Sequence, residues 1–184
     1  MPSRIARTLC IAAAVFLIPA FPVLAQDGGA APQADTLPGG ASSLQESFGD
    51  WMVLCALPGG RKTCSLSQSQ SDAQSRQRIV AIELAAGREG VVGGALAMPF
   101  GLVLAEGVSL KVDGGALGGQ RAFRTCLPAG CIVPLSLAAG DVERLASGET
   151  LELGAIAAEN NQPVTLSIPL DGFAAALQRL RALL

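Results

Sequence analysis

Histidine and tyrosine are absent from this chain of 184 residues, and lysine occurs only as Lys62 and Lys111. Without histidine the chain lacks the usual general base, the commonest metal ligand and the side chain that changes charge near neutral pH. A serine hydrolase would need lysine as its base, yet neither lysine lies in an S-x-x-K motif, and no G-x-S-x-G motif is present. The sequence names no chemical reaction, and we favour a protein that is not an enzyme.

Glycosidase chemistry remains the other route to a hydrolase, because it needs only two carboxylates on opposite sides of a cleft. The available carboxylates occupy positions typical of turns, helix caps and solvated strand faces: Asp113, Asp141, Glu143, Glu149 and Glu152. An unrecognised hydrolase is therefore kept as the enzymatic alternative.

Residues 1–25 have the features of a cleaved export signal. Arg4 and Arg7 give a positive start, and Leu9–Phe21 form an apolar core. Val23-Leu24-Ala25 then places small residues at the positions that a signal peptidase requires. The apolar core is shorter than the roughly 20 residues of a membrane span, so an uncleaved anchor is the weaker alternative. We expect a periplasmic protein with no transmembrane segment after cleavage, and outer-membrane association or secretion stays open.

Removal of this signal would take away two arginines and no acidic residue, leaving 11 basic and 15 acidic residues and a net charge of −4. Lysine and arginine form no run in the mature chain, so the electrostatic footprint of a nucleic-acid-binding protein is missing. A mild negative charge is ordinary and identifies no partner.

Two regions divide the mature chain. Residues 26–47 are rich in Gly, Ala, Pro, Ser and Gln, which predicts a flexible low-complexity linker because little of this segment can be buried. Residues 48–184 are numerous enough for a single domain with its own core. No internal repeat is present.

Short apolar or alternating segments separated by glycine turns predict a mainly β domain. We expect an antiparallel β-sandwich or a curved barrel-like sheet. The long apolar stretch 91–105 contains Gly93, Gly94, Pro99 and Gly101, which indicates strand and turn rather than a membrane helix. The expected strands are 51–55, 63–70, 78–86, 108–112, 122–126, 132–137, 151–157 and 164–168.

Two helices complete the expected fold. Asp141 can cap a short helix that ends at Ser147, with Gly148 in the position after the C-cap. A second helix follows Asp171, and one of its faces carries Phe173, Leu177, Leu180 and Leu184 at helical spacing. This stripe could bind a partner, but we favour a helical lid that closes one end of the β core.

The cysteines form two close pairs once Cys10 is removed with the signal. Oxidising compartments convert neighbouring thiols into structural bridges, so we favour the local disulfides Cys55–Cys64 and Cys126–Cys131. Crossed pairing stays open. A redox-active pair usually has C-x-x-C spacing, and the spacing of Cys126 and Cys131 is wider. A zinc site with four cysteine ligands is disfavoured by the oxidising compartment and by the cysteine spacing.

Five motifs follow one another through the domain: Phe48-Gly49-Asp50-Trp51-x-x-x-Cys55, Met98-Pro99-Phe100-Gly101-Leu102, Glu106-Gly107-Val108-x-Leu110-x-Val112-Asp113, Phe123-x-x-Cys126-x-x-x-Gly130-Cys131 and Ile168-Pro169-Leu170-x-Gly172-Phe173-x-x-Ala176-Leu177. In this order they resemble the invasion-associated locus B family of alphaproteobacterial proteins. The resemblance implies an exported, disulfide-containing, mainly β domain. The family name refers to bacterial entry into host cells, and the resemblance brings no catalytic residues with it.

Two further features have both a structural and a binding interpretation. Trp51 is the only tryptophan, and it could be an exposed anchor, although a large ring beside a disulfide is more typical of a core. Arg121 and Arg124 flank Phe123, which is a weak indication of an anionic partner and is also typical of solvated strand surface.

We interpret the chain as a non-enzymatic envelope protein that acts through protein interaction, with the family resemblance implying an association with host-cell invasion. Its partner would be an unknown protein in the envelope or on a host cell, and we expect no cofactor and no bound metal. A periplasmic maintenance or assembly factor is the main alternative.

The first testable prediction concerns export. Mass spectrometry of the protein purified from cells should show an N-terminus at Gln26 or within a residue or two, because the small residues before it mark the cleavage site. Intact Met1 on most molecules would contradict the periplasmic assignment and remove the basis for expecting disulfides.

Overall fold

The computed structural model describes residues 36–86 and 92–184, which belong to one compact unit that begins at Ala34. The expected signal at residues 1–25 lies outside the described residues. The larger sheet has seven strands in the order β1-β2-β3-β4-β5-β9-β8, and the smaller sheet has four in the order β11-β10-β6-β7. All pairings in both sheets are antiparallel.

The strands of the larger sheet are Ser43–Phe48 (β1), Trp51–Ala56 (β2), Thr63–Ser71 (β3), Arg78–Ala86 (β4), Val92–Met98 (β5), Thr125–Leu127 (β8) and Gly130–Leu137 (β9). Those of the smaller sheet are Ser109–Val112 (β6), Gly115–Ala116 (β7), Thr150–Ile156 (β10) and Pro163–Pro169 (β11). The α-helices are Ala139–Ser147 (α1) and Phe173–Leu183 (α2), and short 3₁₀ turns lie at Pro38–Gly40, Pro58–Gly60 and Leu104–Glu106.

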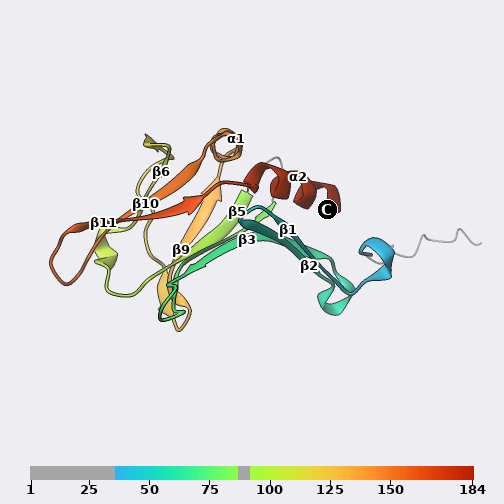
Figure 1. The fold of residues 1–184 in the computed structure, drawn as a ribbon, viewed down its shortest axis with the longest axis horizontal. Helices are drawn as coiled ribbons and strands as arrows, with labels where there is room; N and C mark the ends of the chain where they lie inside the picture. The colour runs from blue at the N-terminus through green and yellow to red at the C-terminus, as the bar shows by residue number, and fades with distance from the viewer. Residues whose placement is uncertain (1–35, 87–91) are drawn as a thin grey trace, which may run out of the picture. The chain divides into compact units, whose positions relative to one another are not determined.

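The expected mainly β fold with two helices is confirmed. Neither sheet closes into a barrel, and the strands form two open sheets. In Figure 1, α2 lies along one side of the larger sheet and contacts β1, β2 and β3, while the smaller sheet lies beside it. Side chains from both sheets and both helices form one core.

Alternation along the strands gives the larger sheet two different sides. In β2 the side chains of Trp51, Val53 and Cys55 are buried on the side that faces α2, which we call the inner side. The residues between them point to the opposite, outer side, as period-two geometry requires. The expected core position of Trp51 is confirmed, since its side chain is 1% exposed.

The C-terminal helix is a lid, as expected, but its buried face differs at one end. Phe173, Leu177 and Leu180 are buried against the core, and Ala176 and Leu183 join them. Leu184 is 59% exposed, so its assignment to the stripe is wrong. The helix ends at Leu183, and the residue after it no longer follows helical spacing. Among residues 36–86 and 92–184, no helix is long and apolar enough to cross a membrane.

The short helix α1 begins earlier than expected. Ala138 occupies the N-cap without a side-chain hydrogen bond, and Asp141 lies in the first turn instead of capping it. A carboxylate there still stabilises the positive end of the helix dipole. Gly148 is the C-cap itself, with φ of −89°, and its N–H donates to the Arg144 carbonyl at 2.9 Å.

The linker expected over residues 26–47 is too long. Residues 43–47 belong to β1, which pairs along its whole length with β2, and Leu37 is 3% exposed in the core. The strand β1 lies at the edge of the sheet and is only half buried, so polar residues are tolerated along it. Its composition therefore does not indicate a strand. The strand expected over 122–126 likewise begins only at Thr125.

Hydrogen bonds to carbonyl groups of β11 join the two sheets. The Pro169 carbonyl, at the end of the edge strand β11, accepts hydrogen bonds from the Trp51 indole N–H at 3.0 Å and the Gln68 amide at 3.2 Å. Gln70 donates similarly to the Ser167 carbonyl at 2.8 Å. Inner-side residues of the larger sheet thus satisfy backbone groups that an edge strand leaves unpaired.

The start of α2 is held by a close backbone approach. Gly172 has φ of +84°, and a Cβ atom at this position would lie 1.9 Å from the Phe48 carbonyl oxygen, so glycine is required. The Asp50 N–H donates to the Asp171 carbonyl at 3.2 Å beside it. Phe173 then meets Trp51 edge to face, with ring centroids 4.8 Å apart.

The lid assignment predicts the effect of shortening a buried leucine. Leu177→Ala should lower the free energy of unfolding by about 2–5 kcal/mol, because it leaves a cavity under α2. Leu184→Ala, at the exposed residue directly after the helix, is the matched control, and it should change stability by no more than about 0.5 kcal/mol. Denaturant unfolding of the two variants measures the difference. Equal, small losses would show that α2 does not pack as described.

An ion pair also ties α2 to the edge of the larger sheet. The Arg179 guanidinium contacts the Glu46 carboxylate through two hydrogen bonds of 2.6 and 2.8 Å. These hydrogen bonds hold the pKa of Glu46 below its ordinary value and raise that of Arg179. A carboxyl whose pKa is lower in the folded state contributes stability above its unfolded pKa, and this contribution is lost as the pH falls through the folded pKa.

Glu46→Gln should therefore lower the melting temperature modestly at neutral pH, and the difference from the parent protein should shrink as the solution is acidified. Arg179→Gln should show the same pH dependence, and the double variant should lose nothing further, because both changes remove one interaction. Thermal melts across the acid range measure this. A difference that stays constant with pH would mean that the pair adds no charge-dependent stability.

Candidate interaction groove on the outer side of the larger sheet

Small side chains predominate on the outer side of the central strands of the larger sheet. Ser67, Glu83, Ala95 and Pro134 lie opposite one another on β3, β4, β5 and β9, and form one row across the sheet. The neighbouring row consists of Ser69, Ala81, Ala97 and Ile132. Most of these residues are half buried although short, and Glu83 and Ser69 are exposed. Another polypeptide could approach this backbone closely.

A β-bulge turns Arg78 toward this outer side. Strict alternation from Val80 would place Arg78 on the inner side. In the structure Gln70 lies opposite Val80, whereas Ser71 lies opposite Arg78, so Ile79 is an extra residue without a partner. Bulges of this kind re-aim side chains. Arg78 consequently lines a surface hollow together with the outer-side residues Ala81 and Ala97.

The ends of β4 and β5 and the hairpin between β8 and β9 enclose a larger hollow, with a volume of about 540 Å³, which we call the Phe100 hollow. It is lined by Gln77, Arg78, Ile79, Ala97, Met98, Pro99, Phe100, Pro128, Ala129 and Gly130. A second hollow of about 340 Å³ lies on the small-residue rows and shares Arg78, Ala97 and Ala129 with the first. We call the two together the outer groove.

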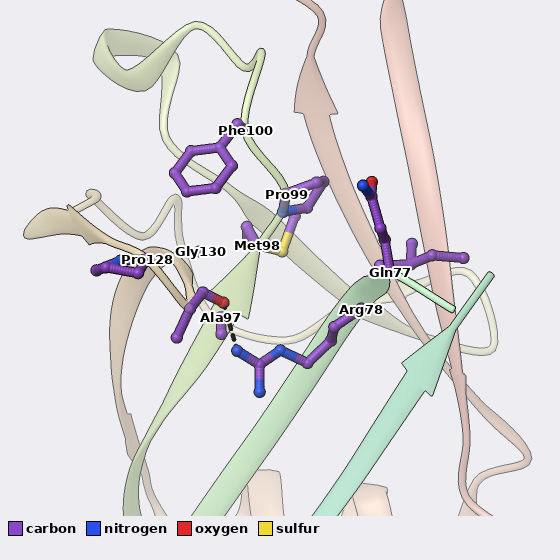
Figure 2. Close-up of a pocket in the computed structure, with 10 residues that line it drawn as sticks. Gln77, Arg78, Ala97, Met98, Pro99, Phe100, Pro128 and Gly130 are labelled. Carbon is purple, nitrogen blue, oxygen red and sulfur yellow. Dashed lines mark hydrogen bonds between the residues drawn. The ribbon is translucent and has the colours of Figure 1, made fainter. Parts of the chain in front are cut away.

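The β8–β9 hairpin forms one wall of the Phe100 hollow. Gly130 has φ of +128°, and a Cβ atom there would lie 2.6 Å from the Met98 carbonyl oxygen, so only glycine lets the hairpin approach β5 this closely. The Cys126–Cys131 disulfide closes the hairpin. Arg78 donates from Nη2 to the Ala129 carbonyl at 2.6 Å, as Figure 2 shows, and so links β4 to the hairpin tip.

Phe100 stands at the opposite side of the hollow from Arg78 (Figure 2) and is 62% exposed. Its segment leaves β5 and is fixed to the smaller sheet, because the Gly101 carbonyl accepts from Ala158 N–H at 2.8 Å. Val103 N–H donates in turn to the Ile156 carbonyl at 2.8 Å. The exposed ring is thus carried by an anchored segment.

Both expected local disulfides are present. Cys55 and Cys64 lie opposite each other on β2 and β3, and Cys126 and Cys131 lie opposite each other on β8 and β9. Only the second pair lies in a hairpin that lines the outer groove. Both disulfides therefore join neighbouring strands, and the Cys126–Cys131 disulfide also lies beside the candidate site.

The arginines and carboxylates considered as candidates in the sequence do not come together in one site. Arg121 is half buried and forms an isolated backbone bridge with Val108, whereas Arg124 is exposed. The Asp113 carboxylate accepts hydrogen bonds from the backbone N–H groups of Glu149 and Thr150, as a turn residue does. Within the described part of the chain, no group of three His, Cys, Asp or Glu residues is placed to hold a metal ion.

Sequence analysis did not single out Arg78 or Phe100 as functional. Phe100 lies in the Met98–Leu102 motif that carries the family resemblance, and residues 126–131 belong to another of these motifs. The two motifs meet at the Phe100 hollow. The presence of both segments among the family motifs was the signal that could have identified the site. The sequence alone does not show that the two segments are neighbours.

The fold and the site define a class of protein: a disulfide-bonded domain of two open antiparallel sheets, covered by a C-terminal helix on one side and bearing a shallow groove on the other. The chain belongs to the invasion associated locus B (IalB) protein family, whose model matches residues 51–181.

Named relatives agree with this assignment. An invasion protein B homolog of Brucella abortus is 47% identical over 150 residues, covering 82% of this chain and 86% of the relative. Invasion protein B of Bartonella bacilliformis is 36% identical over 154 residues, covering 83% of this chain and 82% of the relative. The crystal structure of invasion associated protein B from Bartonella henselae superposes with a TM-score of 0.72 at 36% identity, covering 76% of this chain and 96% of that one.

Proposed function

We propose that this protein is an exported, non-enzymatic component of the bacterial envelope that binds a protein partner through the outer groove. The observation that carries the proposal is a hollow of about 540 Å³ with the exposed Phe100 ring on one side and the Arg78 guanidinium on the other. Aromatic and arginine side chains dominate the binding energy of protein interfaces, above all where a pocket lets them be desolvated.

The division between the two sides of the sheet supports the same proposal. The inner side is filled by the core and by α2, so a partner cannot reach it without unfolding the lid. The outer side offers small residues and the groove. The names of the relatives in Brucella and Bartonella refer to invasion, which favours a partner that takes part in contact with host cells. Export follows from the expected signal at residues 1–25.

Site-specific cross-linking in intact cells tests this proposal. A photo-reactive phenylalanine analogue at Phe100 should capture one defined protein, and the same analogue at Leu127, which is 49% exposed next to the hairpin tip, should capture the same one. Leu184 is the matched control, because it is similarly exposed and directly follows α2. Mass spectrometry identifies the captured protein in each case.

The proposal requires capture from Phe100 and Leu127 and none from Leu184. Capture of that protein from Leu184 alone would place the interaction on the lid. Absence of any defined product at both groove positions would contradict binding through the outer groove.

A further inference from the structure

We propose that the outer groove binds a peptide segment that carries a carboxylate next to an apolar side chain. Arg78 is the anion-binding residue, and the Phe100 hollow holds the apolar side chain. This inference rests on the proposed function and adds the chemical class of the ligand. The carboxylate is either the C-terminus of the peptide or an internal aspartate or glutamate, since both present the same two oxygens.

The charge of the Phe100 hollow indicates an anionic group on the ligand. Arg78 is the one charged residue among the ten that line this hollow. A guanidinium has five N–H donors in a planar fork, which matches the two oxygens of a carboxylate. Within residues 36–86 and 92–184, the hydrogen bond to the Ala129 carbonyl is the only one that this guanidinium makes. Its other donors make no hydrogen bond to the described residues, and the ten residues that line the Phe100 hollow include no carboxylate.

The position of this guanidinium is determined by three features of the fold. The bulge at Ile79 directs the side chain toward the outer side, and the Ala129 carbonyl holds one end of it. The hairpin that supplies this carbonyl is closed by the Cys126–Cys131 disulfide. A donor held in place loses little further side-chain entropy when it binds a ligand. Arg78 is therefore better prepared for an anion than a freely mobile surface arginine.

The apolar part of the hollow indicates an apolar side chain on the ligand. Pro99, Phe100 and Pro128 supply rigid apolar surface, and the buried residue Met98 also lines the hollow. The volume of about 540 Å³ falls within the usual range of ligand pockets, roughly 300–1,000 Å³. An apolar side chain packed against the Phe100 ring would cover it, while the neighbouring carboxylate reaches Arg78.

The continuation of the groove favours a peptide over a small anion. Beyond Arg78 the second hollow crosses the rows of small residues, where Ser67 and Ser69 offer hydroxyl groups. Glu83 lines the far part of this hollow and would repel a second acidic group there. The groove thus fits an extended chain with one carboxylate at Arg78 and neutral or basic groups toward Glu83.

The test uses the full mature chain and defined peptides, with binding measured by isothermal titration calorimetry and by NMR. The first probe is acetyl-Ser-Ala-Ser-Phe with a free C-terminus. The second is the same peptide with a C-terminal amide, and the third is acetyl-Ser-Ala-Glu-Phe amide. Sodium acetate and inorganic phosphate are the small-anion probes. The first and third peptides separate a C-terminal from an internal carboxylate.

We expect at least one carboxylate-bearing peptide to bind. The neutral amide should bind with an affinity at least about tenfold lower, because it lacks the partner for the guanidinium. Arg78→Gln should cause a similar loss, and Phe100→Ala should weaken binding of the same peptide. Arg78→Lys should restore only part of the affinity, since lysine lacks the planar fork. Arg181→Gln, an exposed arginine on α2, is the matched control and should bind as the parent does.

The two disulfides provide an internal comparison. Replacing Cys126 and Cys131 by serine should weaken peptide binding, because the hairpin carries the Ala129 carbonyl that holds Arg78. Replacing Cys55 and Cys64 by serine should leave the affinity of the folded protein unchanged. Melting curves establish the folded fraction of each variant before titration.

The carboxylate proposal is overturned if no peptide binds, if the neutral amide binds as well as the acids, or if Arg78→Gln leaves the affinity unchanged. It is also overturned if acetate or phosphate alone binds as tightly as the peptides, which would make the groove a small-anion site. These outcomes differ from failure of the proposed function. A cross-link from Phe100 that persists in Arg78→Gln would leave the function standing and remove only the carboxylate.

Discussion

The carbonyl oxygen of Pro169 is the point on which the two sheets depend. It ends the edge strand β11 and accepts hydrogen bonds from Trp51 and Gln68, both on the inner side of the larger sheet. An edge strand with unpaired carbonyls invites association with other chains, and proline at both ends of β11 removes two of its N–H donors. The same contacts that satisfy this edge also set the position at which α2 begins. The sheet-to-sheet junction and the lid are therefore one structural feature.

This junction determines which surface remains for binding. The inner side of the larger sheet is committed to the core, with Trp51 against Phe173 and Arg179 of α2 paired with Glu46. The buried side chains on this side are covered by α2 and the core. The proposed binding surface therefore lies on the outer side, where short side chains keep the surface shallow and a bulge brings in the one arginine that strict alternation would have placed inside. Rigid scaffold on one side and accessible groups on the other is a usual arrangement for a binding domain.

Much of the fold could be predicted from sequence because its central elements obey simple periodicity. The alternation in Val108–Val112, the local cysteine pairs and the leucine spacing of α2 each report directly on which side is buried. Two strands are harder to detect. β1 is a polar edge strand, and β5 contains Gly93 and Gly94, so neither has the composition of a typical strand. Leu184 follows the helical stripe in sequence but lies beyond the last helical residue.

The candidate site could not be predicted in the same way, because it depends on tertiary placement. The bulge at Ile79 reverses the direction of Arg78, and no residue type in that segment signals it. Phe100 is apolar and would be assigned to the core by composition, yet the anchored segment holds it outside. Arg78, Phe100 and the hairpin come from separate parts of the chain, and only the register of β4, β5 and β9 brings them together.

Residue-resolved hydrogen exchange of the free protein tests the central claim most directly, namely that the junction at Pro169 unites the lid with both sheets. If it does, amides in the middle of α2, β3 and β11 exchange only through global unfolding and share one opening free energy. The β8–β9 hairpin, with its exposed strand β8, should exchange more readily. An opening free energy for α2 well below that of β3 would contradict the account, because the helix would then detach on its own and expose the inner side to partners.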